Sequence, residues 1–215
     1  LNGKLDWVYQ EEVYGRGRFK GFWLSPKGRY VAFLALDESA VHSFTLVDHI
    51  EDGTHRVRAE EVNYPKAGDP NPVTALGIAD TKTGKVRWAD LSSYEGQEPL
   101  VVRVDWTPAG ICHYMVQDRI QSTCDLRAYN PRKGSDRLLI HEESDSWVNR
   151  PPPARWVGDK TFLWESERTG YNHLYRYRPD GKLLGAVTQG EWAVRGVTHV
   201  DEEAEWITFD ATMDG

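Results

Sequence analysis

Residues 104–110 read Val104-Asp105-Trp106-Thr107-Pro108-Ala109-Gly110, a tryptophan followed by a tight turn, and a hydrophobic run comes next. Similar openings occur at residues 22–28 and 154–160, and a fourth unit begins near Val194. Proline fixes φ and glycine tolerates positive φ, so such residues suit the turns between short strands. Units of about 40 to 50 residues that each hold four short strands are typical of the blades of a β-propeller.

The rest of the chain also favours β structure. Residues 30–36 form an apolar run, and residues 173–178 alternate before Asp180-Gly181, a pair that favours a hairpin turn. The first unit is longer because residues 48–71 add a polar, proline-containing connection. We therefore expect an all-β chain, a partial β-propeller of about three to four antiparallel blades with little helix. A β-sandwich is the alternative, and the recurring tryptophan and turn favour the propeller.

The composition limits the classes of function. The chain has 215 residues, of which 40% are hydrophobic and 27% are charged, as in a globular protein with a sizeable core. The formal charge of −7 disfavours nucleic acid as a partner, because phosphate binding needs a basic surface. Nine tryptophans and ten tyrosines favour the pleated, half-buried surfaces of strands. No apolar run approaches the length of a membrane-spanning helix.

Glu11 and Glu12 are the candidate binding residues of the chain. They stand in Asp6-Trp7-Val8-Tyr9-Gln10-Glu11-Glu12-Val13-Tyr14, among aromatic and β-branched side chains. Such neighbours can anchor a segment in a protein wall while two negative charges point into a cavity. That arrangement suits a cation such as the free α-ammonium of a peptide, which forms charge-assisted hydrogen bonds with carboxylates. The alternative is a solvated pair at the end of a short helix.

No catalytic or metal-binding motif accompanies this pair. The sequence has no Gly-x-Ser-x-Gly elbow, and its seven histidines fit no triad or metal spacing. His141-Glu142-Glu143 lacks a second histidine, so we expect polar residues on a loop there, and we expect Glu167 and Arg168 to form a structural ion pair. We expect no cofactor and no metal.

The two cysteines, Cys112 and Cys124, flank an expected hairpin turn near Asp118. A disulfide across that turn is one interpretation. Two free, partly buried thiols are the interpretation that we favour, because free cysteine behaves as a small hydrophobic residue.

Five motifs occur in series and together cover nearly the whole chain. They are residues 6–13 (DWVYQEEV) with 22–28 (FWLSPKG); residues 62–68 (VNYPKAG) with Asn71-Pro72; residues 104–106 (VDW) with 117–121 (QDRIQ); residues 146–149 (SWVN) with 165–175 (ESERTGYNHLY); and residues 187–192 (VTQGEW). With these motifs the chain resembles the N-terminal β-propeller region of the dipeptidyl peptidase IV family, within the prolyl oligopeptidase family of serine peptidases.

The resemblance implies that, in a longer parent protein, the propeller binds the substrate and another domain carries the catalytic residues. Residues 1–215 would be part of an eight-bladed propeller, and residues 6–14 would be a short helical excursion from a blade, aimed at the active-site cavity. By matching position, Glu11 and Glu12 would bind the substrate α-ammonium. Arg150 would reach the substrate pocket, although the prolines after it depart from the basic and aromatic stretch of mammalian members. The catalytic residues, a Ser-Asp-His triad, would lie on a C-terminal α/β-hydrolase domain absent from this chain.

The implied function is gating and amine recognition in a serine exopeptidase that releases N-terminal dipeptides, with proline or alanine second. The implied partners are peptides with a free N-terminus and the hydrolase domain of the same protein, and the implied compartment is extracytoplasmic. A second copy of the chain is a further expected partner, because an incomplete propeller leaves strand edges unpaired. The alternatives are a non-catalytic interaction propeller and a tripeptidyl or other exopeptidase of the same family.

Overall fold

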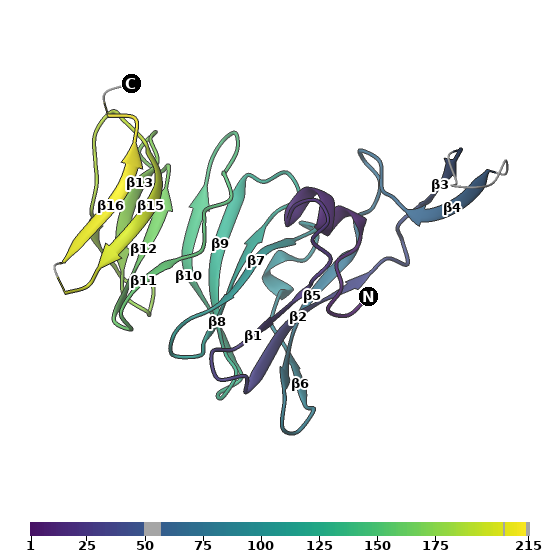
Figure 1. Cartoon of the computed structure of the whole chain (residues 1–215), viewed down its shortest axis with the longest axis horizontal. Coiled ribbons are helices and arrows are strands. Elements are labelled where there is room, and N and C mark those ends of the chain that lie inside the picture. The colour runs from purple at the N-terminus through teal and green to yellow at the C-terminus, as the bar shows by residue number, and fades with distance from the viewer. Residues whose placement is uncertain (50–56, 204, 214–215) are drawn as a thin grey trace.

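The computed structural model describes residues 1–49, 57–203 and 205–213, and these are almost entirely antiparallel β structure. The sheets follow one another across the molecule (Figure 1). Two short helical segments interrupt them, a π-helical turn η1 (Tyr9–Val13) and a 3-10 turn η2 (Ser92–Tyr94). No helix within the described residues is long and apolar enough to cross a membrane.

Three four-stranded sheets and one two-stranded sheet make up the body. The first has the order β1 (Phe22–Leu24), β2 (Tyr30–Asp37), β5 (Val73–Asp80), β6 (Val86–Trp88). The second holds β7 (Leu100–Trp106), β8 (Cys112–Gln117), β9 (Thr123–Asn130) and β10 (Ser135–Glu143). The third holds β11 (Arg155–Val157), β12 (Thr161–Ser166), β13 (His173–Tyr177) and β14 (Leu183–Ala186), and β15 (Val194–Asp201) pairs with β16 (Trp206–Ala211). Successive four-stranded sheets are the blades that the repeated turns predict.

The recurring tryptophan and turn have visible roles. After Trp106 the chain reverses through a turn in which Thr107 and Ile111 are joined by a backbone hydrogen bond of 2.9 Å, and Gly110 takes a φ of +77°. That φ favours glycine. The Trp106 indole Nε1 donates to the carbonyl of Trp23 in the first blade at 3.0 Å. The tryptophan therefore connects one blade to the blade before it.

The core is centred on the second blade, which lies between the first and third sheets (Figure 1). All six residues of β8 are buried. Tyr114 on this strand and Phe162 on β12 have no exposed surface, and neither does Leu34 on β2. A strand covered on both faces lacks the alternation of burial of a half-exposed strand, and β8 buries His113 and Gln117 together with its apolar residues.

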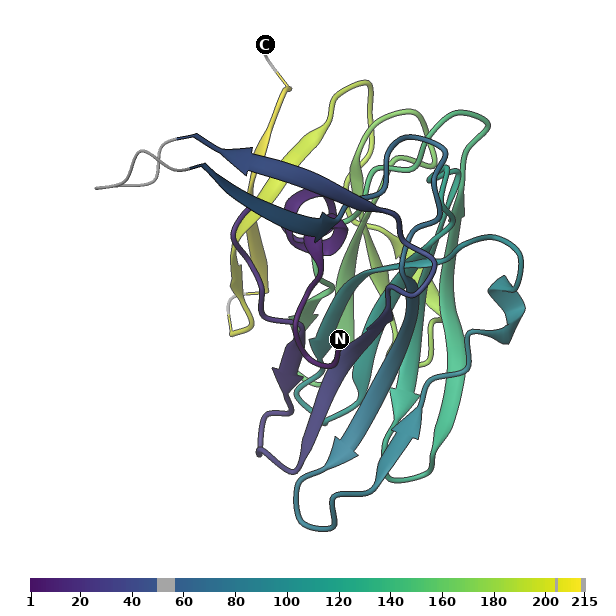
Figure 2. The same ribbon diagram turned by 90° about the vertical axis from the view of Figure 1, so that its right-hand side faces the viewer.

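A two-stranded arm projects from the first blade. It consists of β3 (Ser43–Asp48) and β4 (Arg58–Asn63), inserted between β2 and β5, and it extends away from the sheets in both views (Figures 1 and 2). The sequence predicts a polar connection over residues 48–71. Part of that connection, Arg58–Asn63, is a strand that pairs with β3 along its full length; residues 50–56 lie outside the described residues.

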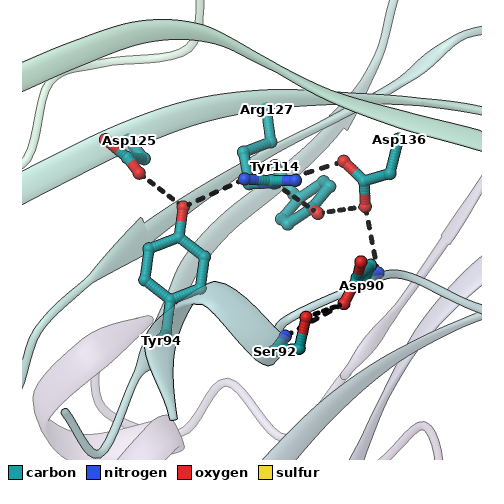
Figure 3. A network of polar contacts seen from close by, with 7 residues as sticks. All are labelled: Asp90, Ser92, Tyr94, Tyr114, Asp125, Arg127 and Asp136. Carbon is teal, nitrogen blue, oxygen red and sulfur yellow. Dashed lines mark hydrogen bonds and ion pairs between the residues drawn. The ribbon is translucent and has the colours of Figure 1, made fainter.

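A polar network joins the first blade to the second (Figure 3). The Arg127 guanidinium donates from Nε to Tyr114 Oη at 3.0 Å and to Asp136 Oδ1 at 3.2 Å. The backbone N–H of Asp90 donates to Asp136 Oδ2 at 3.1 Å, and Arg127 Nη1 lies 3.5 Å from Tyr94 Oη. The network therefore holds the connection around η2 against the outer strands of the second blade.

The expectation of a loop at residues 141–143 is wrong. These residues end β10 and pair with β9. Glu142 is buried and accepts a hydrogen bond from Trp164 Nε1 at 2.9 Å, and Arg168 Nη2 lies 2.5 Å from its Oε1. Arg168 thus pairs with Glu142 and not with Glu167, because the neighbouring blade brings a buried carboxylate closer than the adjacent residue in sequence.

The two cysteines are free and buried, as the favoured interpretation predicts. Cys112 lies opposite Tyr129 and Cys124 lies opposite Gln117 in the strand register, so the thiols do not face each other across the turn. Burial raises the pKa of both thiols. The disulfide interpretation is wrong.

Candidate binding site

The segment that carries Glu11 and Glu12 leaves the first blade and returns to it through paired stems. The backbone N–H of Leu5 donates to the carbonyl of Phe19 at 2.8 Å, and Lys4 and Lys20 form an antiparallel bridge. Residues 5–19 are therefore an excursion closed at its base, as the sequence predicts for residues 6–14. Figure 2 shows its helical turn beside the base of the β3–β4 arm.

Asp6 starts the helical turn. Its Oδ1 accepts a hydrogen bond from the backbone N–H of Tyr9 at 3.0 Å, and its Oδ2 accepts one from Val8 at 3.2 Å. Burial raises the pKa of Asp6, while the two backbone donors act in the opposite direction. The side chain satisfies N–H groups that the first turn of a helix leaves unpaired.

Two tyrosines anchor the turn in the core. Tyr9 is completely buried, and its Oη shares a hydrogen bond of 2.5 Å with Thr74 Oγ1 and accepts one of 3.2 Å from the backbone N–H of Val101. Tyr14 Oη donates to the carbonyl of Val101 at 3.1 Å, and its ring lies 5.6 Å from that of Trp23. The excursion is thus joined to β5 and β7 at once, which fixes its position relative to two blades.

The turn itself places the two glutamates outside this anchor. The backbone N–H of Tyr14 donates to the carbonyl of Tyr9 at 2.8 Å, a five-residue step that defines a π-helical turn. Tyr9, Gln10 and Val13 are buried, whereas Glu11 is half-buried and Glu12 is exposed. Single π-helical turns occur frequently at functional sites.

The two carboxylates differ in their surroundings. Glu11 Oε1 lies 2.8 Å from Nε of Arg16, whose side chain is 87% exposed. An ion pair with so exposed a partner is weak, because water and salt screen it. Glu12 has no ion-pair partner among residues 1–49, 57–203 and 205–213. Both carboxylates can therefore accept a ligand cation at little cost.

Arg150 lies against the excursion. It belongs to the loop between β10 and β11, and its Nη1 donates to the backbone carbonyl of Val13 and, at 3.3 Å, to that of Val102. The structure therefore brings together the three residues that the resemblance assigns to the substrate. The prolines that follow give the loop a rigid course, since Pro151 is buried and accepts a hydrogen bond of 3.2 Å from Arg103 Nε.

Arg103 is a residue of this region that the sequence interpretation missed. It lies in β7 between buried valines, and burial lowers its pKa, with the nearby charge of Arg150 as the next cause. A charged residue between two valines in the run Leu100–Trp106 is the signal that could have identified it. Buried charges of this kind are unusual unless they have a role or a partner.

A polar cleft of about 560 Å³ lies beside the excursion, lined by Trp147, Asn149, Arg150, Glu167, Arg168 and Arg195 among others. Arg150 lines this cleft and also donates to the carbonyl of Val13, so one side chain connects the cleft to the excursion. Within the described part of the chain no cluster of three or more histidine, cysteine or acidic side chains could hold a metal ion. The region offers charged and aromatic groups for binding a ligand.

Comparison with known proteins agrees with this fold. The family described as the dipeptidyl peptidase IV (DPP IV) N-terminal region matches residues 1–215. The chain is 28% identical over 227 residues to a "Probable dipeptidyl peptidase 4" of Neosartorya fischeri and 27% identical over 224 residues to a "Dipeptidyl peptidase 4" of Arthroderma otae. The alignments cover 99% of this chain and only 29% and 28% of those proteins.

A solved structure shares the fold. The crystal structure of Porphyromonas gingivalis dipeptidyl peptidase 4 superposes with a TM-score of 0.84 at 22% identity, over 99% of this chain and 30% of that one. The predicted partial propeller is thus confirmed. Because the family match extends over the entire sequence, this chain belongs to the family of dipeptidyl peptidase IV N-terminal regions.

Proposed function

We propose that this chain is the amine-recognition and substrate-gating part of a serine exopeptidase that releases N-terminal dipeptides. The observation that carries the proposal is the pair Glu11 and Glu12, held side by side on a turn whose neighbours Tyr9, Gln10 and Val13 are buried. The names of the relatives, dipeptidyl peptidases, support the reaction class. Counting two residues from a free end requires a fixed point for that end, and a carboxylate pair supplies one.

Electrostatics favours an ammonium as the ligand of this pair. Hydrogen bonds between an ammonium and carboxylates are stronger than neutral ones, and an ammonium has three donors to share between two acceptor groups. A peptide without a free amine would cover the carboxylates and leave them unpaired, which costs binding energy. The site would therefore select for the N-terminus as well as bind it.

This chain supplies no nucleophile motif of its own. In our proposal the bond-breaking groups belong to a Ser-Asp-His triad on another domain of the parent protein, which uses an acyl-enzyme mechanism. The chain spans less than a third of the relatives that it matches, which leaves ample length for such a domain. The contribution of residues 1–215 is to hold the amine and to restrict access to the cavity.

Two other functions compete with this proposal. A non-catalytic interaction propeller would carry the same fold without a Gly-x-Ser-x-Gly elbow in the parent sequence. A tripeptidyl exopeptidase would carry the elbow but cleave one residue further from the free end. The parent sequence tests the first, and the length of the released product tests the second.

The decisive experiment uses the full-length parent protein and two chromogenic dipeptide substrates that differ only in acetylation of the α-amine. We expect the free-amine substrate to be cleaved with release of the dipeptide and the acetylated one to be rejected. Equal cleavage of both substrates would show that the free amine is not recognised by Glu11 and Glu12. Release of a tripeptide from a longer peptide would favour the tripeptidyl alternative.

A further inference from the structure

A cavity of about 590 Å³ lies next to the cleft described above and has an unusual set of charges. Its wall includes Arg103, Arg150, Arg155 and Arg195, against the carboxylates of Asp105 and Glu165. Four guanidinium groups and two carboxylates give the cavity a positive excess, although the chain as a whole carries a formal charge of −7. The basic character is thus local to this cavity.

The arginines of the cavity donate to backbone carbonyl groups, and the two carboxylates of the wall, Asp105 and Glu165, are too few to balance four guanidinium groups. Arg103 donates to the carbonyl of Pro151, and Arg150 donates to the carbonyls of Val13 and Val102. Arg155 Nη2 lies 3.5 Å from the carbonyl of Thr198. Over residues 1–49, 57–203 and 205–213, no acidic side chain lies within ion-pair distance of these arginines or of Arg195.

Their arrangement is electrostatically unfavourable in the absence of an anion. Arg103 is partly buried close to Arg150, and the like charges repel each other. Carbonyl dipoles satisfy the N–H groups but leave the net charge uncompensated. A carboxylate placed among these groups would form charge-assisted hydrogen bonds and remove the repulsion.

The position of the cavity indicates which carboxylate would reach it. Arg150 lines the cavity and also donates to Val13, the residue that directly follows Glu12. In a peptide bound by its α-ammonium, the side chain of the first residue branches from the same carbon that carries the amine. That side chain is therefore the part of the peptide nearest to both the glutamate pair and the arginines.

We propose that this arginine-lined cavity is a specificity site that accepts an acidic side chain on the first residue of the substrate. The inference rests on the proposed function, since the amine must be held at Glu11 and Glu12. Glu11 and Glu12 alone would repel a substrate whose first residue is acidic. A preference for such a substrate can therefore come only from the positive groups nearby.

The test measures kcat/KM of the full-length protein on chromogenic Glu-Pro, Gln-Pro and Lys-Pro substrates. Glutamate and glutamine have the same shape, so their ratio reports the charge. At low ionic strength we expect the Glu-Pro substrate to exceed Gln-Pro by about three- to tenfold, with Lys-Pro below both. Added salt should reduce the Glu/Gln ratio towards one, because the cavity opens to solvent.

Arg195 provides the variant, because no described partner depends on it. Arg195→Gln should lower the Glu/Gln ratio at least twofold, and this ratio cancels any change that the two substrates share, whereas Arg195→Lys should retain most of the preference. Arg178→Gln is the matched control, since Arg178 pairs with Asp180 at the β13–β14 turn and does not line the cavity. Thermal unfolding of each variant checks that the fold is intact.

The outcomes separate this inference from the proposed function. A wild-type Glu/Gln ratio of one or less overturns the inference, and so does a ratio that Arg195→Gln leaves unchanged. If acetylated substrates are still rejected in that case, the amine-recognition role of Glu11 and Glu12 is retained and only the arginine specificity site is rejected. If acetylated substrates are cleaved normally, the proposed function falls, and the inference falls with it.

Discussion

Arg150 donates a hydrogen bond from its guanidinium to the backbone carbonyl of Val13, although 137 residues separate the two in sequence. The bond ties the loop between β10 and β11 to the last residue of the η1 turn. A cation at the C-terminal end of a helical turn also interacts favourably with the carbonyl groups that the turn leaves unpaired. The loop and the excursion therefore form one structural unit, which carries Glu11, Glu12 and Arg150.

The first prediction concerns the glutamate pair. In the parent protein, Glu11→Gln and Glu12→Gln keep the shape of the side chain and remove one charge each. Loss of a charged hydrogen bond should cost about 1.5–3 kcal/mol, or roughly one to two decades in kcat/KM on free-amine substrates. Glu203→Gln, on an exposed turn outside the site, is the control. A wild-type kcat/KM in both Gln variants would show that Glu11 and Glu12 are solvated surface groups that do not bind the amine.

The second prediction concerns the cap of the excursion. Asp6→Ala leaves the backbone N–H groups of Val8 and Tyr9 without their acceptor in a buried position. We expect a loss of about 1–2 kcal/mol in the free energy of unfolding, measured by denaturant titration. Asp6→Asn retains one acceptor oxygen and should lose less. Equal stability of Asp6→Ala and the wild type would show that the cap does not hold the turn.

The third prediction concerns the base of the excursion. A Cβ added at Gly21 would stand 2.9 Å from Leu5 Cδ2 and 3.2 Å from the backbone carbon of Gly3. Gly21→Ala should therefore push the stems apart and cost about 1–3 kcal/mol of stability. Gly196→Ala is the matched control, because a Cβ there meets nothing within 4 Å. Similar unfolding midpoints for the two variants would contradict the close approach at Gly21.

The fourth prediction concerns the pH dependence of stability. His113 is buried beside Trp156 and Phe162, and its Nδ1 has no hydrogen-bond partner among the described residues. Burial, with a smaller effect of Arg137, lowers its pKa from the usual 6.5 to about 4. Between these values the unfolded chain binds a proton that the folded chain does not.

The folded state should therefore keep the full contribution of neutral His113 above pH 6.5 and lose up to about 3 kcal/mol as the pH falls to 4. Denaturant titrations across this pH range measure the slope. His113→Asn should flatten it, whatever the absolute stability of the variant. His199→Asn, at an exposed position on β15, should leave the slope unchanged. A slope that survives in His113→Asn would assign the effect to other groups.

The fifth prediction concerns the open edge of the last sheet. Among the described residues β16 pairs with β15 alone, and Trp206 on β16 is 74% exposed. An unpaired strand edge is a template for pairing with another chain, so we expect residues 1–215 in isolation to associate with a second copy. Light scattering over a range of concentrations measures the mass, and Trp206→Lys should weaken the association. A monomer at all concentrations would show that the edge is protected in another way.

Much of the fold can be predicted from the sequence, because turns and the alternation of side chains along a strand depend on neighbouring residues. The Asp180-Gly181 turn and the turn at residues 107–110 follow from backbone preferences of single residues. The excursion with Glu11 and Glu12 is expected from the family resemblance, and the cap at Asp6 is not predicted. The strand β4 could not be predicted, because β3 and β4 pair with each other and are exposed along nearly their whole length, so they show no alternating pattern of burial.

The turns and the short strands of the blades could be read from local residue patterns. Which distant groups meet depends on the folded chain. The tertiary structure paired Arg168 with Glu142 in place of Glu167, kept Cys112 and Cys124 apart, and set Arg103 close to Arg150. The physical reason is that turns and strand patterns arise from neighbouring residues. Charge pairing and burial instead depend on how separate blades pack, which no local pattern specifies.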